Sequence, residues 1–206
     1  MAPMHSTEPH TGISIRDRER LLTIARASIV HGFEHKRSLS ESQLNRAGLL
    51  QGRLAESGAS FITLTKYDTL RGCTGSLEAK VPLAADVADN AYHTAFKDYR
   101  FSPLEFSELA DLRIEVTVLS PQTEIMVDSE RDLLESLIPH EDGLVIDDGL
   151  HRATFLPKVW EQVPEPRRFV MELKRKAGLP DEYWSNAMRA FRYHTESFAE
   201  PGEKLP

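Results

Sequence analysis

The stretch Leu70-Arg71-Gly72-Cys73-Thr74-Gly75-Ser76-Leu77 decides the fold, and it contains the single cysteine of the chain. The β-branched and aromatic residues 61–65 before it predict a strand, and residues 67–69 have the composition of a turn. We therefore expect Cys73 to lie on the returning strand of a hairpin. Glycine weakens a strand, so Gly72 and Gly75 indicate a bulge, or the close approach of another backbone or of a ligand.

Cys73 allows two interpretations. In the first, Arg71 lies two residues away on the same strand face and lowers the thiol pKa, while the neighbouring glycines leave that face open. In the second, the cysteine is a small buried apolar residue and the glycines serve only the turn. The second is favoured, because the sequence shows no base or second cysteine nearby.

Length and charge narrow the class of protein. The chain has 206 residues, enough for one domain or for two small lobes that share a core. Its formal net charge of −7 argues against a protein whose main role is to bind nucleic-acid phosphates. A single cysteine excludes an internal disulfide and a zinc site made of cysteines alone. No segment has the apolar length of a membrane span or the core of a signal peptide, so we expect a cytoplasmic protein without a membrane partner.

We expect one domain over residues 14–200. The polar residues 1–13 predict a disordered leader, and residues 201–206 predict a loose tail. Between them, helices and strands follow in mixed order, with several hairpins instead of repeated βαβ units. This order predicts an α+β protein whose mostly antiparallel sheets are covered by helices on one face.

A helix is predicted from Leu83 through Lys97, because apolar residues recur there every four positions. His93 lies beside this apolar stripe, either as an exposed helix histidine or as a general base for Cys73. Asp98 and Arg100 follow in a tight corner, where we expect them to pair and brace the chain rather than bind a ligand.

A strand is predicted over residues 112–119, where apolar residues alternate with polar ones. Glu115 lies on the polar side of this strand. It is either a solvent-exposed residue or a carboxylate of the site, and the pattern allows both.

His31, Glu34 and His35 match the H-x-x-E-H pattern of inverted zinc peptidases. That chemistry needs an intact helix and a third ligand. We expect Gly32 to end the helix and find no marked third ligand, so the pattern favours a solvated helix end and no metal.

The segment Arg167–Lys176 is the most basic part of the chain. Its cations are interpreted as a solvated helix face, with the last ones favoured by the helix dipole. Contact with RNA is the weaker alternative, because exposed aromatic residues do not alternate with the cations.

The chain resembles the AMMECR-type domain family, and within it the bacterial branch called AmmeMemoRadiSam system protein A. The resemblance covers roughly residues 14–200 and rests on several motifs in order: residues 70–77, 95–101, 115–120, 154–157, 176–179 and 193–198. Thr74 stands where the family commonly has isoleucine, and Tyr99 where it commonly has proline.

The resemblance implies a two-layer α/β fold with a larger and a smaller lobe. It implies no assigned reaction and no cofactor. It does imply two partners, namely a Memo-like protein that looks like an extradiol dioxygenase and a radical SAM protein.

Three functions follow as hypotheses. The first is a non-catalytic accessory or scaffold protein for these partners. The second is an enzyme in which Cys73 is the nucleophile or thiol carrier, Arg71 stabilises the thiolate or an anionic substrate, and His93 is the base. The third is an RNA-binding protein. If Cys73, Arg71 and the corner 98–101 meet in space, they define one pocket, and the ligand-binding residues of this hypothesis are Gly72, Thr74, Gly75, Asp98, Arg100 and Phe101.

Overall fold

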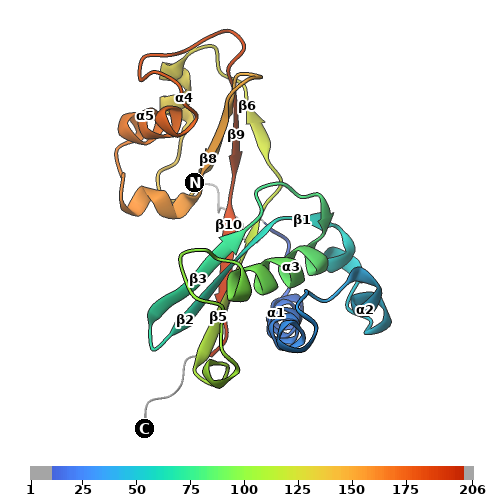
Figure 1. Cartoon of the computed structure of the whole chain (residues 1–206). Helices are drawn as coiled ribbons and strands as arrows, with labels where there is room; N and C mark the ends of the chain where they lie inside the picture. Colours follow the sequence, from blue (N-terminus) through green and yellow to red (C-terminus); the bar gives the residue numbers. More distant parts are fainter. Residues whose placement is uncertain (1–10, 202–206) are drawn as a thin grey trace, which may run out of the picture. The chain divides into compact units, whose positions relative to one another are not determined.

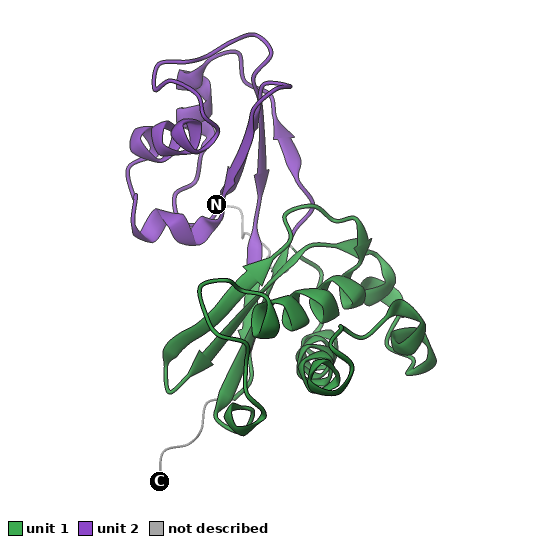
Figure 2. Cartoon of the chain, in the orientation of Figure 1, with its two compact units in different colours: residues 1–119, 196–206 green, residues 120–195 purple. Residues whose placement is uncertain are grey.

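The computed structural model describes residues 11–201, which divide into two compact units (Figure 2). Unit 1 contains the chain up to Leu119 and again from Glu196, and unit 2 contains Ser120–Thr195. The predicted α+β class is confirmed. Most of the predicted leader and tail, residues 1–10 and 202–206, lies outside the described residues. Ile13, however, is a core residue with 1% of its surface exposed, so the ordered domain begins earlier than expected.

Unit 1 is built around a four-stranded antiparallel sheet with the order β10-β5-β2-β3 (Figure 1). Its strands are β2 (Ser60–Lys66), β3 (Thr69–Gly75), β5 (Leu112–Leu119) and β10 (Thr195–Ala199). The short strands β1 (Ser57–Gly58) and β4 (Val81–Pro82) pair with each other. The helical elements are α1 (Ile15–His35), α2 (Glu41–Arg46), η1 (Gly52–Ala55), α3 (Leu83–Phe96) and η2 (Phe106–Glu108). The predicted strand 112–119 and the predicted helix from Leu83 are both confirmed, and the helix ends at Phe96, one residue before the predicted Lys97.

Both long helices of unit 1 lie on the same face of this sheet (Figure 1). Helix α3 packs on β2 and β3, and α1 packs on α3 and β5. The helices cover this face because alternate residues of the strands point toward it and are apolar. These residues are fully buried: Ile62 and Leu64 on β2, and Ile114 and Val116 on β5. The residues between them point to the opposite face, which remains partly exposed.

The hairpin turn between β2 and β3 is formed by Tyr67 and Asp68, as predicted. Both residues have positive φ, 49° and 58°. This conformation suits the right-handed twist of the paired strands, although it is unusual for a tyrosine.

Gly32 does not end the first helix, contrary to expectation. Helix α1 continues to His35, and Lys36 in the left-handed conformation caps it through a bond to the carbonyl of Gly32. A Cβ at position 32 would lie only 2.6 Å from the ring of Phe96 and 2.7 Å from that of Tyr92. The glycine therefore allows α1 and α3 to pack closely.

Unit 2 has its own four-stranded antiparallel sheet, with the order β6-β9-β7-β8. Its strands are β6 (Thr123–Ile125), β7 (Gly143–Asp147), β8 (Arg152–Phe155) and β9 (Arg189–Tyr193). Its helical elements are α4 (Glu130–Ser136), η3 (Pro157–Glu161) and α5 (Pro166–Lys176). The core of this unit includes Trp160 stacked on Phe169, with ring centroids 3.7 Å apart.

Among residues 11–201, no helix is both long enough and apolar enough to cross a membrane.

Candidate functional site

The two faces of β3 have different roles. Gly72 and Thr74 face α3: the hydroxyls of Thr74 and Thr94 are 2.6 Å apart, and a Cβ at Gly72 would lie 2.8 Å from the carbonyl oxygen of Thr94. The register with β2 shifts between Leu64 and Thr65, so Arg71 lies in a bulge of the kind that the glycines predict. Cys73, which pairs with Thr63, points to the opposite face of the sheet. Cys73 is partly exposed there.

The glycines do not open the face of Cys73, which corrects the expectation from the sequence. Gly72 allows the close approach of α3 on the other side of the sheet. Gly75 lies opposite Phe61 on β2, and a Cβ at Gly75 would overlap the ring of that residue. Both glycines are therefore explained by packing.

The backbone of Cys73 is held by Asp98 and Arg100. The N–H of Cys73 donates to Asp98 Oδ2 at 2.9 Å, and Arg100 Nη2 donates to the carbonyl of Cys73 at 2.5 Å. Arg100 also donates to both oxygens of Asp98, at 2.9 and 2.7 Å. Because β3 is an edge strand, these side chains replace the hydrogen bonds that a further strand would make. We call these two residues the Cys73 clamp.

The two residues of the clamp differ in exposure, since Asp98 is buried and Arg100 reaches the surface. The side chain of Asp98 is 2% exposed and that of Arg100 is 45% exposed. Hydrogen bonds from Arg100, together with the N–H of Cys73, hold the pKa of Asp98 well below its usual range despite the opposing effect of burial. The expected pairing of Asp98 with Arg100 is thus present, and its added role is to fix the cysteine backbone. Phe101 completes the corner, with its N–H bonded to the carbonyl of Asp98 and its ring 5.6 Å from the Arg100 guanidinium carbon.

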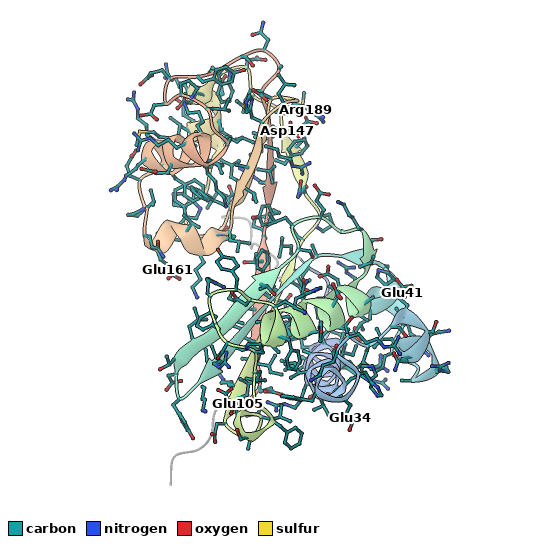
Figure 3. All side chains as sticks on the ribbon, in the orientation of Figure 1. Glu34, Glu41, Glu105, Asp147, Glu161 and Arg189 are labelled. Carbon is teal, nitrogen blue, oxygen red and sulfur yellow. The ribbon has the colours of Figure 1, made fainter. Side chains whose placement is uncertain are left out.

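Arg71 makes a separate contact with the loop after α3. Its Nε and Nη2 donate to the two oxygens of Glu108 at 3.0 and 2.9 Å, and its Nη1 donates to the carbonyl of Ser102 at 3.0 Å. Glu105, labelled in Figure 3, donates its backbone N–H to Glu108 as well. The hydrogen bonds from Arg71 lower the pKa of Glu108 to about 2 despite the opposing effect of burial, and the weaker bond from the Glu105 N–H acts in the same direction as Arg71.

These contacts bear on the catalytic role expected for Arg71. A bidentate carboxylate neutralises the guanidinium, and only 15% of the Arg71 side chain is exposed. Its donors serve the fold, so the contacts give no support to Arg71 as a partner of a thiolate or of an anionic substrate.

A row of polar side chains crosses the outer face of the sheet. The register places Cys73 of β3 opposite Thr63 of β2, and Thr63 opposite Glu115 of β5. The Thr63 hydroxyl lies 3.5 Å from the Cys73 sulfur. Glu115 lies two strands away, about 10 Å at the usual strand spacing, so it belongs to the same surface without touching the thiol.

His93 is not brought to Cys73. It is exposed on α3 and pairs with Asp89, with 3.1 Å between Nδ1 and Oδ2. Helix α3 covers one face of the sheet and the Cys73 side chain lies on the other. The placement therefore gives no support to His93 as the base.

The H-x-x-E-H pattern lies at the end of α1, which is an intact helix through His35. The rings of His31 and His35 lie 4.1 Å apart on α1, and Glu34 is exposed there (Figure 3). Within residues 11–201, no group of three or more histidine, cysteine or acidic side chains is placed to hold a metal.

The cations of α5 are largely engaged within unit 2. Lys174 is 1% exposed and binds Glu130 at 2.9 Å, while Arg175 binds Asp181 at 2.7 Å. Lys176 donates to the carbonyl of Thr154. A surface for RNA would need these groups free.

Sequence reasoning missed Glu108 and Thr63. Glu108 lies in no recognisable motif and is identified only by its contact with Arg71, 37 residues away. Thr63 lies in the predicted strand 61–65, and only the hairpin register shows that it is opposite Cys73.

Comparisons with known proteins agree with the fold. The model of the AMMECR1 family matches residues 22–198. Protein LS215_2104 of Saccharolobus islandicus is 37% identical over 187 residues, covering 87% of this chain and 80% of its own. Protein MK0488 of Methanopyrus kandleri is 32% identical over 180 residues, covering 84% and 82%. The crystal structure of the uncharacterized protein PH0010 from Pyrococcus horikoshii superposes with a TM-score of 0.76 at 26% identity, covering 94% of this chain and 96% of that one.

Proposed function

Because the chain belongs to the AMMECR1 family, we propose that it is a non-catalytic accessory protein that works with a Memo-like, dioxygenase-like protein and a radical SAM protein. The observation that supports this proposal is that the charged side chains near Cys73 are bonded to other parts of the protein, which leaves them unsuited to act on a substrate. Arg71 is bonded to Glu108, and Asp98 and Arg100 are bonded to each other and to the backbone of Cys73.

A catalytic site usually keeps titratable groups available to the substrate, with pKa values suited to proton transfer. Here the carboxylates that contact Arg71 and the Cys73 backbone, Glu108 and Asp98, have pKa values lowered by arginine partners of the fold. Such groups stay ionised at neutral pH and hold segments in place. The result is a fixed surface around Cys73, which suits recognition better than chemistry.

Co-purification tests this proposal. The tagged full-length chain is co-expressed with the Memo-like and radical SAM proteins of the same genome, and a tagged unrelated protein serves as the control. We expect at least one of the two partners to be recovered in a stoichiometric complex. Recovery of neither partner would contradict the accessory role.

A cysteine-dependent enzyme is the second candidate, favoured by the partial exposure of Cys73 and by the hydroxyl of Thr63 near its sulfur. The test is the rate of alkylation by iodoacetamide between about pH 5 and 10, compared with a free thiol. A nucleophilic Cys73 would react faster than the free thiol at neutral pH. A rate equal to or below that of the free thiol removes this candidate. RNA binding remains the least supported function, because three of the five α5 cations are engaged within unit 2 and the chain has a formal net charge of −7.

A further inference from the structure

Tyr99 is the most exposed large apolar side chain of residues 11–201, with 96% of its surface open. It occupies the centre of the corner that follows α3. A single exposed aromatic ring is common on protein surfaces, so the support and the charge of its neighbours decide whether it marks a binding surface.

The backbone on both sides of Tyr99 is fixed. Asp98 precedes it and Arg100 follows it, and both side chains are bonded to Cys73 of β3. The N–H of Leu104 also bonds the carbonyl of Ala95, which closes the corner onto the end of α3. A ring on so rigid a support loses little conformational freedom when it is covered, and tyrosine and arginine are common energetic centres of protein interfaces.

The residues that flank Tyr99 in the sequence include two cations. Lys97 and Arg100 are both exposed. The carboxylate that neutralises Arg100 is buried, with 2% of the Asp98 side chain exposed against 45% of Arg100. Asp98 balances the charge of Arg100, so Lys97 leaves the corner 97–100 with a net positive charge, on a chain whose formal net charge is −7.

We propose that Lys97, Tyr99 and Arg100, the basic aromatic strip, dock an acidic segment of a partner protein. Carboxylates of that segment contact the two cations, and an apolar side chain between them covers the ring. The strip is the site at which the proposed accessory function would recognise its partner, and so it rests on that function. A nucleic acid is the less favourable occupant, because the rest of the chain repels a phosphate backbone.

Fluorescence anisotropy of a labelled synthetic peptide tests the strip. The peptide has about fifteen residues, with glutamates flanking a central Leu-Trp pair. Polyglutamate and single-stranded DNA of similar length are the comparison probes. We expect the Leu-Trp peptide to bind more tightly than either comparison probe. Tyr99→Ser should weaken it at least about tenfold, as expected for a central interface aromatic.

Two further variants sharpen the test. Lys97→Glu should weaken the same peptide and reduce the salt dependence of its binding. Tyr67→Asn is the matched control, because Tyr67 is another tyrosine with 71% exposure and asparagine suits its positive φ. Its affinity should equal that of the natural chain, and thermal melting should show that all variants fold.

Four results would contradict the proposed docking role of the strip. They are no binding of the Leu-Trp peptide, equal affinity for polyglutamate, tighter Tyr99-dependent binding of DNA, or equal losses of peptide affinity in Tyr99→Ser and Tyr67→Asn. Co-purification with Tyr99→Ser separates this inference from the accessory role. If both chains recover the partner equally, the strip is wrong and the role stands. If the peptide binds through Tyr99 but the natural chain recovers no partner, the role fails and the strip stands.

Discussion

The carboxylate of Asp98 accepts a hydrogen bond from the backbone N–H of Cys73 at 2.9 Å, across 25 residues of sequence. Arg100 returns the contact by donating to the carbonyl of the same cysteine at 2.5 Å. One residue of an edge strand is thus held on both sides by an ion pair whose carboxylate is buried, and the predictions below follow from that arrangement.

Asp98→Asn should lower the free energy of unfolding by about 2–4 kcal/mol, because it leaves Arg100 and Cys73 with an uncharged partner in a buried position. Urea titration measures the change. Glu135→Gln is the control, since it breaks an exposed pair with Arg131 and should cost less than about 0.5 kcal/mol. Equal losses in the two variants would show that the clamp is no stronger than a surface ion pair.

The free energy of unfolding should decrease in acid, because protonation of Glu108 removes its ion pair with Arg71. Its pKa in the folded protein is about 2, below the usual value of 4.5. A carboxyl with a lowered folded pKa stabilises the protein above its unfolded pKa, and this contribution is lost as the pH falls toward the folded pKa. The loss should lie between about pH 5 and pH 2.

Glu108→Gln isolates this effect, because its unfolding free energy should decline less steeply with acid than that of the natural chain. Asp86 acts in the opposite direction, since burial raises its pKa. It is common to both proteins and cancels in the difference. Parallel curves for the two proteins would contradict the assignment.

Gly72→Ala should destabilise unit 1 by about 1–3 kcal/mol, the usual cost of overpacking. The added methyl would lie 2.8 Å from the Thr94 carbonyl oxygen and 3.0 Å from its Cγ2. Thr69→Ala, at an exposed position of the same strand, should change the melting temperature little. A neutral Gly72→Ala would show that α3 yields at this point, and the packing explanation of the glycine would be lost.

Removing both clamp residues should expose the edge of β3. In the double variant Asp98→Ala, Arg100→Ala, the N–H and C=O of Cys73 lose their partners and become available to another chain. We expect stronger concentration-dependent association than in the natural chain, measured by sedimentation velocity. Unchanged association would mean that the clamp does not protect the edge.

Much of the local structure could be predicted from the sequence. Strand 112–119 and helix 83–96 follow from periods of two and about four residues, and both pack against the core that these periods define. The turn at Tyr67 and Asp68 and the pairing of Asp98 with Arg100 are also local. Such features depend on neighbours within a few positions, which a single sequence displays.

The site itself depended on contacts that the sequence does not display. Gly72 was expected to open the face of Cys73, but its free space is filled by α3 from the other side. Arg71 was expected beside a thiolate, but it binds Glu108 in a segment without any motif. His93 shares a helix with the residues that face β3, yet it points to solvent. Each outcome depends on which face of one element meets a distant element, and residue type alone does not specify this.

Hydrogen exchange of the Cys73 amide tests the central claim most directly. Edge amides facing solvent exchange quickly, so protection at this position requires the bond to Asp98. We predict slow exchange in the natural chain and fast exchange at Cys73 in Asp98→Asn, while the neighbouring Thr74 amide, which alternation directs toward β2, stays protected in both. Fast exchange of Cys73 in the natural chain would contradict the account.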